Sequence, residues 1–134
     1  MFRNFKLVPG VIFGRGCFAQ LDEILSHQRN EKDDWAVFVT DDVFTGTPLA
    51  SRIPLHDNDM LLYVNVDDEP KTGYVDQLTQ QVKDARPTLP CAVVGIGGGS
   101  AMDLAKAVSV MLTNPGSSTQ YQGWDLIKHR AVYH

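Results

Sequence analysis

The segment spanning residues 91–112 constrains the fold of this chain more than any other feature. An apolar run over residues 91–96 leads into Gly97, Gly98 and Gly99, and apolar residues at helical spacing follow. This order predicts a buried strand, a tight turn and a helix that begins at the glycines. Backbone N–H groups at a helix N-terminus attract anions, and glycines let a phosphate approach the main chain closely. We interpret the turn as the pyrophosphate site of a nucleotide or dinucleotide; the alternative is a close-packed turn that binds no ligand.

Hydrophobic periodicity predicts the elements on either side of this turn. We expect residues 2–13 to form a β-hairpin or a pair of edge strands around Pro9 and Gly10. A short helix is predicted to begin at Thr47, and Pro54 interrupts it. Longer strands are predicted over residues 35–40, 60–66 and 91–96, and longer helices over residues 17–28, 71–86 and 99–112.

The alternation of strands and helices indicates the fold class. Consecutive strand–helix–strand units form right-handed crossovers and therefore a parallel sheet. We predict an α/β, Rossmann-like nucleotide-binding domain over residues 1–116. Residues 117–134 contain no strand or helix pattern beyond one turn around residues 121–124, and we assign them to an incomplete tail of the same domain.

Asp41 is the first candidate for a residue that recognises the nucleotide. It follows the predicted strand 35–40, at the edge where open α/β sheets bind their ligands. A carboxylate there accepts hydrogen bonds from the ribose hydroxyls of adenosine and repels a 2′-phosphate, which predicts a preference for NAD over NADP. Asp42 is the second candidate for this role, and the alternative is an aspartate that only caps the following turn. The acidic residue precedes the glycines here, whereas it follows them in the common dinucleotide-binding fingerprint.

Ser100 and Asp103 stand at the beginning of the predicted helix, three residues apart. Their spacing is close to that of a capping box, in which side chains satisfy the first backbone N–H groups. The alternative is that the Asp103 carboxylate lies near the reactive end of a cofactor or orients water and substrate. Lys106 follows one turn later and is expected to pair with Asp103.

Composition excludes several other classes of function. The net charge of −4 provides no basic surface for nucleic acid, and no apolar run reaches the roughly 20 residues of a membrane span. The two cysteines and four histidines lack the spacing of metal ligands or of a disulfide framework. We therefore assign no catalytic residue and no metal ligand within the chain, and we expect a cytoplasmic protein without nucleic-acid or membrane partners.

The motif Gly97-Gly-Gly-Ser-x-x-Asp103-x-x-Lys106, preceded by Val39-Thr-Asp41 and by Phe13-Gly-Arg-Gly16, resembles the iron-containing (group III) alcohol dehydrogenases. Glycerol dehydrogenases and dehydroquinate synthases share this layout with altered glycine loops and are the less similar alternatives. The resemblance implies that Asp41 binds the adenosine ribose of NAD and that Asp103 lies on the nicotinamide side of the cleft. It also implies a pyrophosphate site made of Gly97, Gly98, Gly99 and Ser100.

The same resemblance implies that this chain is the N-terminal, NAD-binding portion of a longer enzyme. Full-length members have a following helical domain, where an Asp and three His hold Fe²⁺ or Zn²⁺, and they often pair into homodimers through their opening strands. We expect the chain to be inactive alone and its parent to oxidise a small-molecule alcohol. A narrower likeness, to members that oxidise the C8 hydroxyl of an eight-carbon sugar acid, rests on residues 1–6, 68–78 and 121–125. The alternatives are a freestanding nucleotide-binding module without chemistry and a degenerate product that binds nothing.

Overall fold

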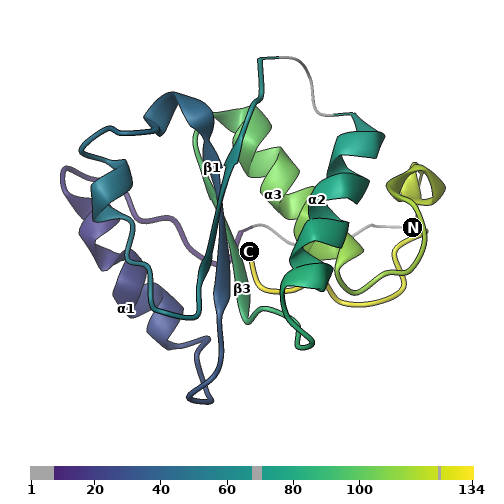
Figure 1. The fold of residues 1–134 in the computed structure, drawn as a ribbon, viewed down its shortest axis with the longest axis horizontal. Helices are drawn as coiled ribbons and strands as arrows, with labels where there is room; N and C mark the ends of the chain where they lie inside the picture. Colours follow the sequence, from purple (N-terminus) through teal and green to yellow (C-terminus); the bar gives the residue numbers. More distant parts are fainter. Residues whose placement is uncertain (1–7, 68–70, 124) are drawn as a thin grey trace, which may run out of the picture.

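The computed structural model describes residues 8–67, 71–123 and 125–134. Its centre is a parallel sheet in the order β2-β1-β3, made of β1 (Ala36–Asp41), β2 (Met60–Val64) and β3 (Ala92–Ile96). Helix α1 (Leu21–Ser26) covers one face, and α2 (Thr72–Ala85) and α3 (Gly99–Met111) cover the other (Figure 1). The predicted α/β fold with a parallel, Rossmann-like sheet is confirmed.

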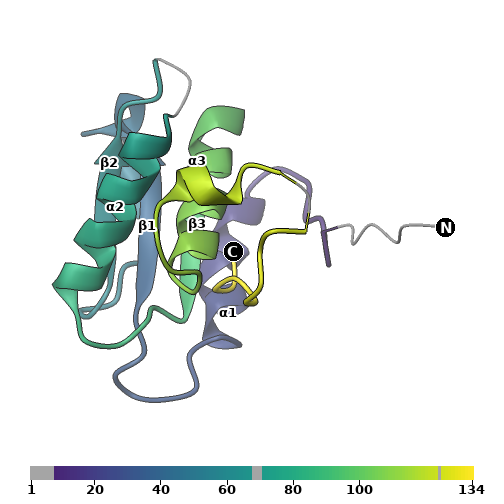
Figure 2. The same cartoon turned by 90° about the vertical axis from the view of Figure 1, so that its right-hand side faces the viewer.

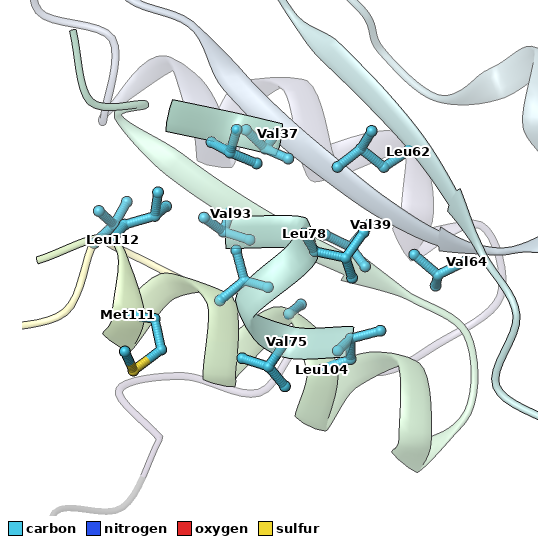
Figure 3. Close-up of a cluster of buried hydrophobic side chains, with 14 of the residues drawn as sticks. Val37, Val39, Leu62, Val64, Val75, Leu78, Val93, Leu104, Met111 and Leu112 are labelled. Carbon is cyan, nitrogen blue, oxygen red and sulfur yellow. The ribbon is translucent and has the colours of Figure 1, made fainter. Parts of the chain in front are cut away.

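The core is divided by the sheet into two apolar layers. All of β1 up to Thr40 is buried, and its side chains alternate between the two faces. Val37 and Val39 pack with α2 and α3 (Figure 3), whereas Ala36 and Phe38 pack with α1 and its neighbours. This burial on both sides explains why the strand appears in the sequence as a continuous apolar run.

The longer predicted elements agree with the structure to within a few residues, except that the helix predicted over residues 17–28 begins as a 3₁₀ turn, η1 (Cys17–Gln20), and is α-helical only over Leu21–Ser26. The short helix predicted after Thr47 does not form. Residues Ala50–Arg52 make one 3₁₀ turn, η3, instead. The Thr47 hydroxyl donates to the Phe44 carbonyl at 2.7 Å and accepts from the Ala50 N–H at 3.4 Å. Because Pro54 disfavours helical geometry at the residue before it, too few residues remain to nucleate an α-helix.

The predicted N-terminal hairpin is not found in the part of the chain that the structure describes. Its first strand falls on residues 1–7, which lie outside the described residues. Residues 8–13 form no strand, and the Phe13 side chain is 99% exposed. The alternation of apolar residues predicted a buried face, but a strand also needs a partner for its backbone groups, and residues 8–13 pair with none of the described residues.

Parts of the tail contact the two helices on this face of the sheet: residues Ser118–Tyr121 lie beside α2, and the Val132 N–H donates to the Ser109 carbonyl of α3 at 3.1 Å (Figure 2). The 3₁₀ turn η4 (Ser118–Tyr121) begins three residues earlier than predicted, and Trp124 lies outside the described residues. Asp76 on α2 accepts hydrogen bonds from the Ser117 hydroxyl at 2.5 Å and the Ser118 N–H at 2.8 Å, and these lower its pKa.

Two further contacts fix the end of the tail. The buried Asn114 side chain accepts from the backbone N–H groups of Lys128 and His129, both at 3.1 Å. Tyr133 forms an isolated parallel bridge with Ala92, and its carbonyl accepts from Val93 N at 2.8 Å. The tail therefore reaches the open edge of β3. In the described ranges, no helix combines the length and the apolar character that crossing a membrane requires.

A buried ion pair holds together the amino ends of β1 and β2. Arg29 donates two hydrogen bonds to the Asp59 carboxylate, at 2.9 and 2.6 Å. Asp59 also accepts from the backbone N–H groups of Ala36, at 2.8 Å, and His56, at 2.9 Å, and its side chain is fully buried. Burial alone raises the pKa of this carboxyl, but the hydrogen bonds from Arg29 and the two backbone groups outweigh it and hold the pKa below its ordinary value.

We predict that Asp59→Asn lowers the free energy of unfolding by about 3 kcal/mol, because it leaves the buried Arg29 without its counter-charge. Since the folded-state pKa of Asp59 lies below the ordinary value of 3.8, its stabilisation is complete well above pH 3.8 and is lost as the pH falls through the folded-state pKa. Urea unfolding at neutral and acidic pH measures both effects, and the variant should lose less stability on acidification than the wild type. The control is Asp22→Asn, which removes the exposed pair with His56 and should change stability by less than about 0.5 kcal/mol. Equal effects of the two substitutions at neutral pH would contradict the role assigned to Asp59.

Candidate functional site

The candidate site lies at the edge of the sheet where all three parallel strands end. Asp41 is the last residue of β1, Gly97 follows β3, and Asn65 follows β2. The register places Asp41 beside Val64 and Thr40 beside Ile96. The three strand ends are therefore level with one another, as expected at the ligand-binding edge of an open α/β sheet.

Two glycines at this edge are required by packing within the chain. A Cβ atom on Gly95 would lie 2.9 Å from the Ala105 Cβ and 3.0 Å from the Met102 Cα. On Gly97, where φ is +150°, a Cβ atom would lie 2.8 Å from the Ala101 Cβ. Real Cβ atoms do not come this close to other atoms, so α3 can lie against β3 only if both positions are glycine. The turn is therefore close-packed at Gly97.

Packing does not account for the next two glycines. A Cβ atom on Gly98 or Gly99 would meet no heavy atom within 4 Å, and both residues are exposed. Gly98 has φ −75° and ψ −175°, which any residue adopts. It is the N-cap of α3, and no side chain caps the helix. The first N–H groups of α3 therefore lack a side-chain partner and lie beside an open surface at the positive end of the helix dipole.

The structure brings Asp41 against the glycine turn. A Cβ atom on Gly97 would lie 2.9 Å from the Asp41 Cβ and 3.6 Å from its Oδ2. The other carboxylate oxygen, Oδ1, accepts from the Val43 N–H at 3.1 Å and caps the short turn η2 (Asp42–Phe44). The capping role given as an alternative is therefore present, and it uses only one of the two oxygens.

The capping box predicted for Ser100 and Asp103 is wrong. Helix α3 begins at Gly99, so Ser100 is its second residue, and neither side chain caps the helix. The helix begins two residues earlier than it would if Ser100 were its N-cap. The predicted ion pair is confirmed, with Lys106 Nζ 3.1 Å from Asp103 Oδ1, and both side chains are more than half exposed. Ser100 is exposed at the same helix end as Gly98 and Gly99.

Sequence reasoning missed one polar residue at this edge. Asn65, which we had placed inside a strand ending at residue 66, lies just beyond β2 and donates to Asp42 Oδ2 at 3.2 Å. The signal for it was a single polar residue directly after the apolar run of β2. Asp42 itself, the second candidate for ribose binding, is directed to Asn65 on the β2 side of Asp41.

The structure gives no ligand set for a metal among the residues it describes. No three His, Cys, Asp or Glu side chains of residues 8–67, 71–123 and 125–134 gather closely enough to hold a metal ion. Cys17 and Cys91 are free and half-buried, and burial raises the pKa of the Cys91 thiol.

The sequence profile of the iron-containing alcohol dehydrogenases matches residues 9–132. The chain belongs to this family. It is 29% identical over 131 residues to alcohol dehydrogenase 4 of Saccharomyces cerevisiae, covering 96% of this chain and 33% of that protein. It is 28% identical over 130 residues to the NAD-dependent methanol dehydrogenase of Bacillus methanolicus, with coverage of 96% and 33%. The sulfoacetaldehyde reductase of Bilophila wadsworthia is 28% identical over 129 residues, with coverage of 93% and 32%.

The chain is much shorter than the relatives that it matches. It spans about a third of the length of the curated alcohol dehydrogenases and reductases that it matches. The glycine turn and Asp41 both lie inside the region that the family profile covers.

Substitution of a packed glycine and of an exposed glycine in this iron-containing alcohol dehydrogenase sequence should change the free energy of unfolding by different amounts. Gly97→Ala is expected to lower the free energy of unfolding by about 2–4 kcal/mol, because its methyl group overlaps Ala101 and Asp41 and because φ is positive. Gly98→Ala should change stability by less than about 1 kcal/mol, since its methyl group meets no atom and the restriction of the unfolded chain offsets the poorer N-cap that alanine makes. Chemical denaturation of both variants tests this, and a loss of more than 1 kcal/mol in Gly98→Ala, roughly the upper end of the Gly→Ala effect at an unstrained site, would refute it.

Proposed function

We propose that this chain is the NAD-binding portion of a metal-dependent alcohol dehydrogenase. The observation that carries the proposal is the pair of exposed glycines, Gly98 and Gly99, which neither packing nor backbone conformation requires. Glycine lowers the stability of a helix, because it gives the unfolded chain more conformational freedom to lose on folding, so two glycines at the start of α3 call for a reason. A phosphate group seated against the bare backbone provides that reason. The residues assigned to the pyrophosphate are Gly97, Gly98, Gly99 and Ser100.

The electrostatics of this helix end support an anionic ligand. The first backbone N–H groups of α3 have no side-chain cap, and no acidic residue lies in its first turn. No side chain in the first turn of α3 itself therefore compensates the partial positive charge of the helix N-terminus. Pyrophosphate oxygens would accept hydrogen bonds from these N–H groups, and Ser100 would add a hydroxyl donor.

Asp41 is assigned to the ribose of the adenosine half. Its Oδ2 lies beside the glycine turn, and its Oδ1 is held by the Val43 N–H, so the carboxylate is oriented before any ligand binds. Two adjacent ribose hydroxyls are good donors to a fixed carboxylate. This assignment predicts NAD in preference to NADP, in line with the name of the methanol dehydrogenase relative.

The reaction we propose for the whole protein is the NAD-linked oxidation of a small-molecule alcohol. NAD would accept the hydride, and Fe²⁺ or Zn²⁺ would polarise the alcohol oxygen. The described residues do not gather ligands for such an ion, so we derive no step through it. Asp103, at the exposed end of α3, is assigned to the nicotinamide side, and the chain alone is proposed to bind NAD without chemistry.

The substrate, assembly and location of the parent enzyme are proposed from resemblance. The resemblance of residues 1–6, 68–78 and 121–125 to 3-deoxy-α-D-manno-octulosonate 8-oxidase favours the C8 hydroxyl of an eight-carbon sugar acid as substrate. A homodimer is proposed from the resemblance to the alcohol dehydrogenase family, and a cytoplasmic location from the composition of the chain. The relatives named above act, by their names, on other alcohols and on an aldehyde, so the substrate must be tested directly.

Calorimetric titration of NAD into the 134-residue chain tests the binding site. We expect saturable binding that falls roughly tenfold in Asp41→Ala, which loses a charge-assisted hydrogen bond. Gly98→Ala should also weaken binding, since its methyl group occupies the approach to the helix N-terminus, while stability is kept. The matched control is Gly73→Ala on α2, where a Cβ atom also meets nothing within 4 Å. Unchanged affinity in both Asp41→Ala and Gly98→Ala, or no binding by the wild type, would reject the assignment.

An activity measurement separates a binding module from a working enzyme. The chain is incubated with NAD, Fe²⁺ or Zn²⁺, and simple alcohols or the eight-carbon sugar acid, and NADH is followed by its absorbance. We expect NAD to bind and no NADH to form, because the metal-dependent step is proposed to need the remainder of the parent protein. Sustained NADH formation by this chain would overturn the proposal that it is inactive alone.

A further inference from the structure

The segment that leads into η1 and α1 lies beside the glycine turn, on the face of the sheet that α1 covers. A hollow on this face is lined by Ile12 and Cys17 on one side and by Gly95 and Gly97 on the other. The buried ion pair with Asp59 follows the other end of α1, at the amino edge of the sheet. The chain therefore enters η1 at the carboxyl edge, where the proposed cofactor binds, and leaves α1 at the amino edge (Figure 1).

Arg15 lies in this segment, between two glycines of positive φ. The angle φ is +152° at Gly14 and +77° at Gly16, and a Cβ atom on either residue would meet nothing within 4 Å. The path of the backbone, and not packing, therefore requires these two glycines. That path turns the chain into η1 and leaves Arg15 exposed at its start. Since two residues span at most about 7 Å, the Arg15 Cα lies within that distance of the Cys17 Cα, in the wall of the hollow.

The glycine turn alone does not balance the charge of a pyrophosphate. Each phosphate of that group is anionic, whereas a helix N-terminus offers only about half an elementary charge. The Asp41 carboxylate beside the turn adds a further negative charge. Farther along α3, the charge of Lys106 is balanced by Asp103. A pyrophosphate seated at this turn therefore needs another cation.

Arg15 has the chemistry and the position for that role. The ion pairs formed within the described ranges do not include it. A guanidinium binds phosphate oxygens through two parallel N–H donors, which a backbone turn lacks. We propose that Arg15 binds the pyrophosphate of the cofactor from the α1 side of β3, while the N–H groups at the start of α3 bind it from the other side. This inference rests on the proposed function.

Calorimetric titration of the full chain with NAD and with ADP, which has a diphosphate but no nicotinamide half, tests this inference. Arg15→Gln should weaken the binding of both ligands about threefold to tenfold, between the effect of an exposed ion pair and that of a charge-assisted hydrogen bond. Arg15→Lys keeps the charge but loses the planar pair of donors, so it should recover part of the lost affinity. Raising the salt concentration should weaken binding more in the wild type than in Arg15→Gln, because exposed charges are screened.

A matched control separates this contact from a general effect of charge. Lys32→Gln removes one positive charge from the loop between Arg29 and Asp34, which lies at the amino edge, and should change both affinities by less than about twofold. Urea unfolding of Arg15→Gln should match that of the wild type, since the side chain is exposed.

The outcomes distinguish this inference from the proposed function. If the wild type binds neither NAD nor ADP, the proposed function fails and this inference fails with it. If the wild type binds both and Arg15→Gln binds them equally well, only this inference is overturned. It is also overturned if Lys32→Gln weakens binding as much as Arg15→Gln, or if the loss in Arg15→Gln is the same at low and high salt.

Discussion

The close contact of α3 with β3 is the constraint on which the candidate site depends. Gly95 and Gly97 remove the Cβ atoms that would otherwise strike Ala105 and Ala101, and so let the helix lie against the strand. That approach sets where α3 begins and brings its N-terminus beside Asp41. A methyl group on either glycine would push α3 away from β3 and would move the bare N–H groups away from the Asp41 carboxylate. Packing and site geometry are thus decided by the same few atoms.

The glycine run performs two different tasks that look identical in the sequence. Gly97 is a requirement of the fold, because of its positive φ and its contacts, whereas Gly98 and Gly99 have open space where their side chains would be. The turn was interpreted from sequence as either a close-packed turn or a phosphate site. The structure divides it at the peptide bond after Gly97, with packing on one side and an accessible helix end on the other. The second part supplies the exposed helix N-terminus that the proposed pyrophosphate site uses.

The features that follow from local pattern were predicted well, and those that depend on distant partners were not. The apolar run of β1 and the helical spacing of apolar residues in α2 can be recognised from neighbouring residues alone. A strand buried on both faces gives a continuous apolar run, and a helix buried on one face gives apolar residues every three to four positions. The tail gave no such signal, since its placement depends on the buried side chain of Asn114, whose partners lie 14 and 15 residues away. Asn65 was missed for the same reason. Its role comes from Asp42, 23 residues earlier.

The two edges of the sheet treat charge in opposite ways. At the amino edge, the Asp59 carboxylate is fully buried and satisfied by Arg29 and two backbone N–H groups, so its charge serves stability. At the carboxyl edge, Asp41 has one oxygen bound by a backbone N–H and one beside an open turn, so its charge remains available. Unsatisfied polar groups weaken a fold unless water or a ligand reaches them. The buried ion pair at the amino edge stabilises the fold. The carboxyl edge can therefore keep the unpaired carboxylate and the bare N–H groups that recognition of a dinucleotide requires.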